Sequence, residues 1–243
     1  WNAMRLARRQ FLTTATAAGF ALGTGRARAA NVPVRIGVIP ILATAPILMA
    51  EQQGWLAAAG LAPTVTTFES GPNMIQALAS GTLDIYVAGV APLGVARARG
   101  VDVKVVAATA IEENVFIAGA KLAPYLAAGP DFAAGFRKFR TENGAPARLA
   151  TQPLGSVPNT TLQHWLWEVV KADRADVAIV PMGIDATQQA VAAAAVEGGI
   201  MREPAVTIVT QRNPAIRLMA RGGEMFPNQP GTVVALALGV VAL

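Results

Sequence analysis

Residues 68–92 constrain the fold more than any other stretch of this 243-residue chain. They read as the end of a strand, a polar turn, a helix, a second turn, a short buried strand at 85–87 and another polar turn. Both polar turns end in a proline that begins a helix, Pro72 and Pro92, where the missing N–H costs no hydrogen bond. A strand that runs through small residues into a helix leaves backbone N–H groups bare at the sheet edge, which is where open α/β sheets bind ligands.

The same alternation of β-rich runs and helical stretches continues on both sides of this segment. Short β-branched or apolar runs predict strands, and apolar residues that recur on one face predict helices. Strands are expected at 34–39, 64–68, 85–87, 103–108, 147–151, 177–180, 207–209 and 232–238, and helices at 46–59, 72–79, 92–98, 158–172 and 186–196. This order predicts an α/β fold with mostly parallel sheets and helices on both faces.

The pattern loosens between residues 112 and 148, which indicates the passage from one lobe to a second. The passage contains a basic patch at 136–140, which is typical of the solvated face of a helix. The scheme of strand, turn, proline and helix then resumes, so the second lobe repeats the organisation of the first.

The amino end has the features of an export signal. Arg8 and Arg9 precede an apolar run at 11–23, and the small-x-small sequence at 27–29 offers a cleavage site. Paired arginines before Phe-Leu favour a twin-arginine signal, which exports folded proteins, over an ordinary leader of the general secretory route. We therefore expect residues 1–29 to be an export signal and the mature protein to be periplasmic.

The leader changes how the charge of the chain is interpreted. The whole sequence has a formal charge of +5 and a pI near 10.2, as nucleic-acid-binding proteins often do. Five of the 20 basic residues lie in the leader, however, and the rest equal the 15 acidic residues in number. The mature protein is formally neutral, and we expect no nucleic-acid partner. The sequence has no cysteine, which excludes disulfides, thiolate metal sites and a cysteine nucleophile.

Four predicted strand-to-helix turns share one design, in which small or hydroxyl residues precede a proline. They lie at 43–46, 70–72, 89–92 and 155–158, and none contains Lys or Arg. Each helix start presents unpaired N–H donors and a partial positive charge of roughly half a unit. If the turns face one crevice, they favour an oxyanion, and the candidate ligand-binding residues are Thr44, Ser70, Gly71, Gly89, Val90 and Ser156. The alternative is that the turns only cap helices, which explains each of them taken alone.

The ordered series of motifs resembles the nitrate/sulfonate/taurine-type substrate-binding proteins of bacterial ABC importers. The resemblance runs from residue 34 to about 104, and more loosely from 155 to 231. Its markers are Ala45-Pro46, Glu51-Gln52-Gln53-Gly54-Trp55, Ala59-Gly60-Leu61, Ser70-Gly71, Ala77-Leu78-Ala79-Ser80-Gly81, Asp84, Gly89, Pro92, Val180-Pro181-Met182, Gly198 and Glu203-Pro204. The sequence departs from the family at 135–138, where a Gly-Lys turn is usual. It also ends at Leu243, where the family continues with helices that pack on the first lobe.

The resemblance implies a two-lobed, periplasmic-binding-protein-like fold of type II that closes about a hinge, with C-terminal helices of the family missing. Lobe 1 would comprise residues 30–112 and 229–243, and lobe 2 residues 113–228. The implied protein is a monomeric receptor, not an enzyme, without cofactor or metal. It would bind a small anionic or zwitterionic ligand (sulfonate, taurine, nitrate or similar) and deliver it to an ABC permease and ATPase. Carried over to this sequence, the resemblance adds Asn159, Thr160 and Glu203 to the candidate residues, with Glu203 facing a cationic group of the ligand.

Two alternatives stay open. One is an enzyme, although the single histidine, His164, stands beside Trp165 and Trp167 as in a packed helix. No catalytic triad, phosphate loop, dinucleotide fingerprint or metal-ligand spacing is visible in the sequence. The fold family also includes a thiamine-pyrimidine synthase with a cysteine-rich motif that this sequence lacks, so a pyrimidine-type ligand receptor or enzyme remains an alternative. The other is a ligand-binding sensor module, which needs the same cleft as a transport receptor.

Overall fold

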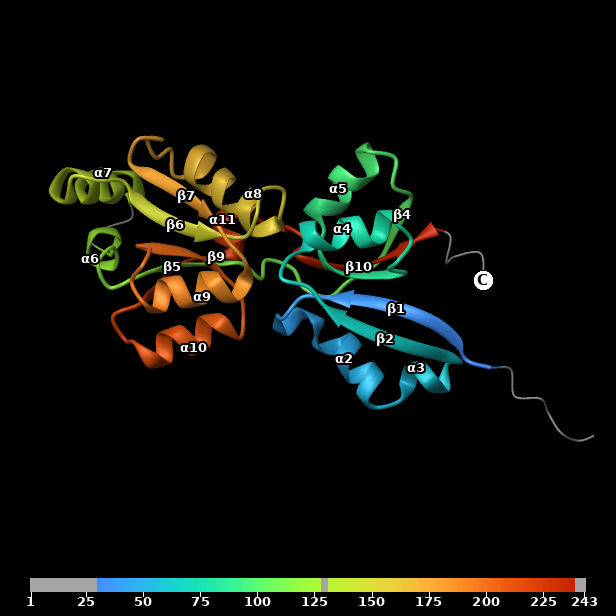
Figure 1. Cartoon of the computed structure of the whole chain (residues 1–243). Helices are drawn as coiled ribbons and strands as arrows, with labels where there is room; N and C mark the ends of the chain where they lie inside the picture. Colours follow the sequence, from blue (N-terminus) through green and yellow to red (C-terminus); the bar gives the residue numbers. More distant parts are fainter. Residues whose placement is uncertain (1–29, 128–130, 239–243) are drawn as a thin grey trace, which may run out of the picture. The chain divides into compact units, whose positions relative to one another are not determined.

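Two five-stranded sheets organise the described part of the chain (Figure 1). The computed structural model describes residues 30–127 and 131–238, so the predicted leader at 1–29 lies outside the described residues. The first sheet has the strand order β2-β1-β3-β10-β4, and the second has the order β7-β6-β8-β5-β9. Both belong to one compact unit that begins at Pro33.

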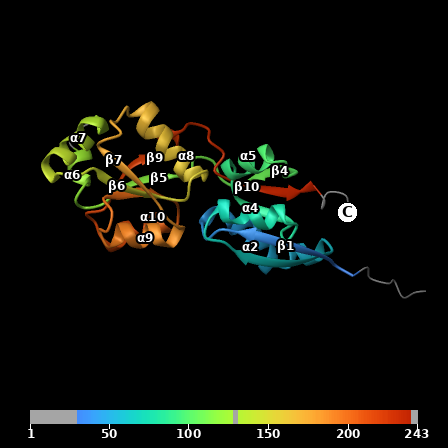
Figure 2. The same ribbon diagram turned by 45° about the horizontal axis from the view of Figure 1, so that its top comes forward.

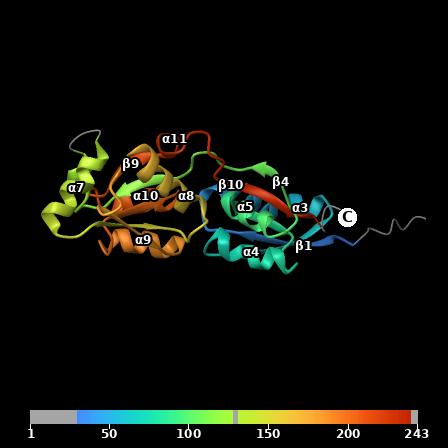
Figure 3. The same ribbon diagram turned by 90° about the horizontal axis from the view of Figure 1, so that it is seen from above.

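The first sheet is built mainly from the first part of the chain. Its strands are β1 (Val32–Val38), β2 (Leu61–Thr67), β3 (Ile85–Gly89), β4 (Val103–Ala108) and β10 (Thr232–Ala237). Its helices are the 3-10 helix η1 (Leu42–Thr44), α2 (Ala45–Gln52), α3 (Trp55–Ala58), α4 (Gly71–Ala79) and α5 (Ala91–Ala98). β1 and β3 are parallel, whereas β10 is antiparallel to both of its neighbours, β3 and β4. Figure 3 shows this late strand beside β4.

The second sheet has the same kind of architecture. Its strands are β5 (Val115–Ala118), β6 (Ala147–Thr151), β7 (Val177–Pro181), β8 (Gly198–Met201) and β9 (Arg217–Arg221). Its helices are α6 (Ala123–Leu126), α7 (Phe132–Asn143), α8 (Val157–His164), the π-helix η2 (Trp165–Val169), α9 (Ile184–Ala192), α10 (Ala205–Arg212) and α11 (Gly222–Met225). β6 is parallel to β7 and β8, and β5 is antiparallel to β8 and β9.

Helices cover both faces of each sheet because side chains alternate in direction along a strand. On β3, Tyr86 belongs to the apolar cluster with α4 and α5, and Val87 to the cluster with residues of α2 and α3. On β6, Leu149 packs with α7 and α8, and Ala150 packs with α9 and α10. Figures 1 and 2 show α9 and α10 on the opposite side of the second sheet from α7 and α8. The predicted α/β fold with helices on both faces of each sheet is confirmed. Each sheet is mixed, because β10 and β5 run antiparallel to both of their neighbours.

Several predicted elements are confirmed, and three need correction. The strands at 103–108 and 147–151 have the predicted bounds. The predicted strand at 207–209 is wrong, because these residues lie in α10, where Val206 and Val209 are buried against the second sheet. The predicted helix at 46–59 is broken at Gly54, which has a left-handed φ of 72°. The predicted helix at 158–172 is α-helical only to His164 and continues as η2.

Three strands escaped prediction, and β8 shows the reason. It reads Gly-Gly-Ile-Met, and glycine is depleted in strands. A Cβ at Gly198 would lie 2.6 Å from the carbonyl oxygen of Ile117, and one at Gly199 would lie 2.5 Å from that of Ala150. β8, the central strand, therefore needs glycine to pack closely against its neighbours. Because glycine has a low strand propensity, β8 could not be predicted from the sequence.

Candidate functional site

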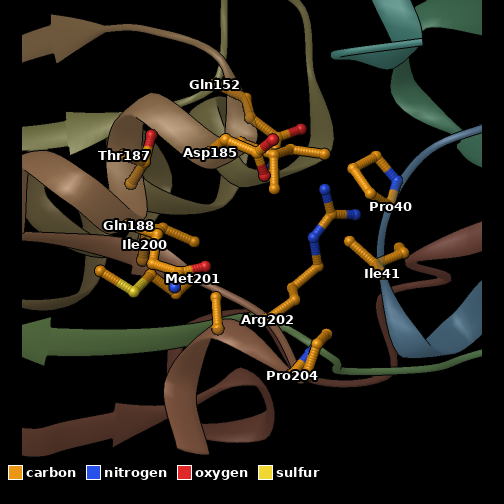
Figure 4. A pocket seen from close by; sticks show the side chains of 12 residues that line it. Pro40, Ile41, Gln152, Asp185, Thr187, Gln188, Ile200, Met201, Arg202 and Pro204 are labelled. Atoms are coloured by element: carbon orange, nitrogen blue, oxygen red, sulfur yellow. The ribbon is translucent and has the colours of Figure 1, made fainter. Parts of the chain in front are cut away.

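A cavity of about 200 Å³ lies where strands of both sheets end (Figure 4). Its walls come from the segment after β1, the ends of β6 and β8, and the starts of α9 and α10. The lining residues are Pro40, Ile41, Gln152, Ile184, Asp185, Thr187, Gln188, Ile200, Met201, Arg202, Pro204 and Ala205. A second cavity of about 160 Å³ shares Pro40, Ile184 and Asp185 with the first, and Glu69 also lines it. The carboxyl ends of parallel strands are the usual ligand position in α/β sheets.

Arg202 is the cation of this cavity. Its side chain is only 2% exposed, and its guanidinium reaches into the space between Pro40, Ile41 and Asp185 (Figure 4). Nη1 donates to Oε1 of Glu113 at 3.1 Å. Nε and Nη2 are buried and have no hydrogen-bond partner among the described residues. Two donors of a buried charge are therefore available to a ligand.

Tyr86 connects this charge to two of the predicted turns. Burial raises the pKa of the Tyr86 phenol, and the charge of Arg202 partly opposes that rise. The Tyr86 hydroxyl donates to the carbonyl of Gly89 at 2.7 Å. A Cβ at Gly71 would lie 2.5 Å from the same hydroxyl. The Tyr86 hydroxyl therefore contacts residues at the starts of α4 and α5 and interacts electrostatically with Arg202.

The three hydroxyl residues of the predicted turns differ in what they bind. The Oγ of Ser156 accepts from the N–H of Asn159 at 3.3 Å and caps α8. Thr44 donates to the carbonyls of Ile39 and Ile41 at 3.1 and 2.7 Å, and it caps nothing. Ser70 precedes α4 and is fully buried, yet its Oγ has no partner in the described structure. An unpaired buried hydroxyl at a helix start is a second feature that a polar ligand would satisfy.

The structure brings some candidate residues together across the two sheets. A Cβ at Gly89 would lie 2.8 Å from Cγ2 of Val157, so the turn at the start of α5 meets the turn at the start of α8. Val90 donates from its N–H to the carbonyl of Gly231 at 3.1 Å. The backbone carbonyl of Glu203, just after β8, accepts from the N–H of Leu42 in η1 at 2.9 Å, which links segments that follow strands of the two sheets.

Other candidate side chains are engaged elsewhere. The carboxylate of Glu203 accepts from the N–H and the hydroxyl of Thr207, both at 3.1 Å, within α10. Asn159 accepts from Gln163 at 2.6 Å, and Thr160 donates to the carbonyl of Ser156 at 3.0 Å. Asn159 and Thr160 line a different surface hollow, which also contains His164.

Arg202 escaped prediction because it follows β8, the strand that its glycines concealed. An arginine directly before Glu203-Pro204 and a helix is visible in the sequence. Only the position of β8 places that arginine at the carboxyl end of a central strand.

The described residues hold no group of three or more His, Asp or Glu side chains arranged to bind a metal ion. No helix in the described ranges has both the length and the apolar character needed to cross a membrane.

Three solved structures of ligand-binding proteins superpose on this chain. The ligand-binding component of an ABC-type import system from Staphylococcus aureus, solved with zinc bound, superposes with a TM-score of 0.70 at 17% identity over 87% of this chain and 68% of that one. The alkanesulfonate-binding protein SsuA from Xanthomonas axonopodis pv. citri, bound to MOPS, gives 0.65 at 20% identity over 87% and 67%. The periplasmic nitrate-binding protein NrtA from Synechocystis PCC 6803 gives 0.72 at 14% identity over 87% and 57%. No curated protein matches the sequence.

These likenesses confirm the predicted two-lobed, periplasmic-binding-protein-like fold and the resemblance to nitrate/sulfonate-type substrate-binding proteins. The sequence model of the NMT1-like family also matches this chain, over residues 27–242. With a match over nearly its whole length, and with two sheets that meet at a cavity, this chain belongs to the NMT1-like family.

Proposed function

We propose that this protein is an extracytoplasmic solute receptor that binds a small anion at Arg202 and delivers it to the permease and ATPase of an ABC importer. The observation that carries the proposal is the buried guanidinium with two uncommitted donors. A buried charge is costly unless hydrogen bonds and an opposite charge satisfy it. Glu113 accepts only one of the hydrogen bonds of Arg202. A planar or tetrahedral oxyanion offers the paired acceptors that match a guanidinium fork.

The size of the cavity favours a short ligand. Its volume of about 200 Å³ is below the ~300–1,000 Å³ of pockets for drug-sized molecules. Two structural relatives are named for binding alkanesulfonates and nitrate, both small oxyanions. In this proposal the hydroxyl of Ser70 and the backbone N–H of Gly71 complete the oxyanion site from the first lobe, whereas the N–H of Val90 already donates to the carbonyl of Gly231. Gly89, Thr44, Ser156, Asn159, Thr160 and Glu203 remain candidates.

A zwitterion is the second ligand class, and Asp185 favours it. This carboxylate lines both cavities, and Glu69 lines the second. A ligand whose anionic end binds Arg202 could therefore place an amine near Asp185. We assign this role to Asp185 in preference to Glu203, because the carboxylate of Glu203 already accepts two hydrogen bonds from Thr207.

Binding can be tested with a thermal-shift panel. The purified protein is heated with nitrate, methanesulfonate, ethanesulfonate, taurine, bicarbonate or acetate, and with neutral glycerol as a blank. The buffer must contain no sulfonate, which excludes MOPS and HEPES. A ligand at about 100 times its Kd adds about 2.7 kcal/mol to the stability of the folded state, or roughly 5–10 °C in Tm for a chain of this size.

Arg202→Gln should abolish the shift, and Arg148→Gln is the matched control. Arg148 also pairs with a buried carboxylate, but half of its side chain is exposed and it does not line the cavity. Taurine and ethanesulfonate differ only in the amine, so Asp185→Asn should weaken taurine alone if the amine binds there. No shift with any anion, or equal shifts in both arginine variants, would contradict the proposed function.

A further inference from the structure

A single oxygen atom joins the ligand-site arginine to a distant strand. Oε1 of Glu113 accepts from Nη1 of Arg202 at 3.1 Å and from the hydroxyl of Thr232 at 2.6 Å. The side chains of Arg202 and Glu113 are only 2% and 10% exposed. Thr232 is itself fully buried. The three side chains therefore form one buried chain of hydrogen bonds.

Glu113 and Thr232 lie in the two segments that connect the sheets. Glu113 lies in the first segment that passes from one sheet to the other, between β4 and β5. Thr232 lies at the end of the second such segment, where β10 enters the first sheet. The two segments run side by side, with a β-bridge between Ile111 and Pro230 and a 3.0 Å bond from the N–H of Gly231 to the carbonyl of Ala110. These paired crossings are where the sheets would rotate about each other.

Packing fixes the position of the Glu113 carboxylate. A Cβ at Gly231 would lie 2.6 Å from Oε1 of Glu113 and 2.7 Å from its Cγ. Gly231 does not have a positive φ. Position 231 requires glycine because the side chain of Glu113 occupies the space of a Cβ. The Glu113 carboxylate therefore packs against the backbone of Gly231 and accepts a hydrogen bond from the hydroxyl of Thr232.

We propose that Glu113 is the positioning residue of the anion site and that it couples Arg202 to the crossings between the sheets. By accepting from Nη1, it fixes the guanidinium so that Nε and Nη2 remain free for the anion. A rotation at the crossings that moves Thr232 moves the carboxylate, and with it the two free donors. An anion held by those donors therefore favours one arrangement of the crossings over others. This inference rests on the proposed function of Arg202.

A positioning role and simple charge neutralisation predict opposite changes in anion affinity when Glu113 is replaced. If Glu113 only balances the charge of Arg202, Glu113→Gln removes a negative charge beside the anion, so the anion should bind more tightly. If Glu113 positions the guanidinium, the same substitution should weaken binding. Thr232→Val alters no charge, so it should have no effect in the first case and should weaken binding in the second.

Titration calorimetry with ethanesulfonate and nitrate can decide between these cases. We expect a roughly tenfold weaker Kd for Glu113→Gln and a smaller loss for Thr232→Val, by analogy with the ~10–100-fold effect of residues that orient metal ligands. Gly231→Ala should also weaken binding, because its Cβ displaces the carboxylate. Glu113→Asp, which keeps the charge but shortens the reach, should not restore affinity. Glu142→Gln is the control, because Glu142 lies on α7 and its carboxylate accepts from the hydroxyl of Tyr125 and not from Arg202.

Small-angle scattering of the same variants measures the coupling. The unchanged protein should become more compact when ethanesulfonate is added, and Thr232→Val should require more ethanesulfonate for the same change. Equal or tighter anion binding by Glu113→Gln and Thr232→Val would overturn the inference and leave the proposed function intact. No binding of any anion by the unchanged protein would instead refute the proposed function, and the inference with it.

Discussion

The Cβ position of Gly89 lies 2.8 Å from Cγ2 of Val157, so the end of β3 and the start of α8 meet at a point with room only for glycine. Gly89→Ala should push these segments apart. We expect a loss of about 1–3 kcal/mol in the free energy of unfolding, as for other overpacked positions, and weaker anion binding. Urea denaturation and calorimetry measure the two effects. Val157→Ala should restore much of the loss, because it removes the opposing methyl group.

Gly94→Ala is the control for this pair. Gly94 lies within α5, and a Cβ there would lie more than 4 Å from every described atom outside its own stretch of helix. Alanine there should stabilise the protein by roughly 0.5–1 kcal/mol through helix propensity. If Gly89→Ala proves as harmless as Gly94→Ala, the two segments do not meet in solution as they do in the structure.

Alanine should lower the stability of the protein at Ser156 but not at Ser70. Both precede helices, but only Ser156 accepts a hydrogen bond from the helix it precedes. Ser156→Ala should cost about 1 kcal/mol of stability. Ser70→Ala removes a buried hydroxyl without a partner in the described structure, so it should leave the ligand-free protein unchanged or slightly more stable. It should nevertheless weaken anion binding. A stability loss at Ser70 as large as that at Ser156 would contradict this prediction.

Removal of Arg202 alone should harm stability more than removal of the whole ion pair. Arg202→Met leaves the largely buried carboxylate of Glu113 without its cation, and breaking a buried pair costs about 3–5 kcal/mol. Glu113→Gln combined with Arg202→Met leaves no uncompensated charge and should recover most of that loss. A double-mutant cycle by urea denaturation, without anions of the panel, measures the coupling. Additive losses would show that the two side chains do not interact.

The free energy of unfolding should decrease at acid pH because two ion pairs, Arg35–Asp84 and Arg148–Glu197, lose their negative charge. Hydrogen bonds from Arg35 lower the pKa of Asp84. Burial opposes ionisation of Glu197, but hydrogen bonds from Arg148 outweigh it, and the pKa of Glu197 is also lowered. Both carboxyls have lower pKa values in the folded state than in the unfolded chain, where they are about 4. Their contribution is therefore complete above about pH 5 and is lost as pH falls through the folded-state values.

Urea midpoints between pH 7 and pH 3 test this dependence. The double variant Asp84→Asn with Glu197→Gln should be less stable at pH 7 and should lose less stability on acidification. Glu168→Gln is the control, since Glu168 is 65% exposed and its ion-pair partner, Lys171, is exposed as well. If the double variant keeps the acid dependence of the unchanged protein, other carboxylates are responsible.

The two ion pairs also show what the sequence contained about the fold. Arg35 and Asp84 are 49 residues apart, and so are Arg148 and Glu197. In each pair the arginine lies on the second strand of its sheet and binds an acid that directly precedes the parallel strand in the middle of that sheet. In both pairs the N–H of the acid also donates to the carbonyl of the arginine. The repetition of the strand-turn-helix scheme was visible in the sequence. The matching ion pairs became visible only when β8 was located.

Local pattern alone determined the strand and helix alternation, the proline-started helices and the α/β class, because these depend on periodicity and on backbone preferences within a few residues. Tertiary structure decided the rest. Packing against the second sheet makes a helix of residues 207–209, and close approach of neighbouring strands makes a strand of Gly198-Gly199. It also gathers Glu113, Arg202 and Thr232, which lie up to 119 residues apart, at one buried carboxylate oxygen. A charge becomes a binding site through its burial and its unpaired donors, and both are properties of the folded surroundings.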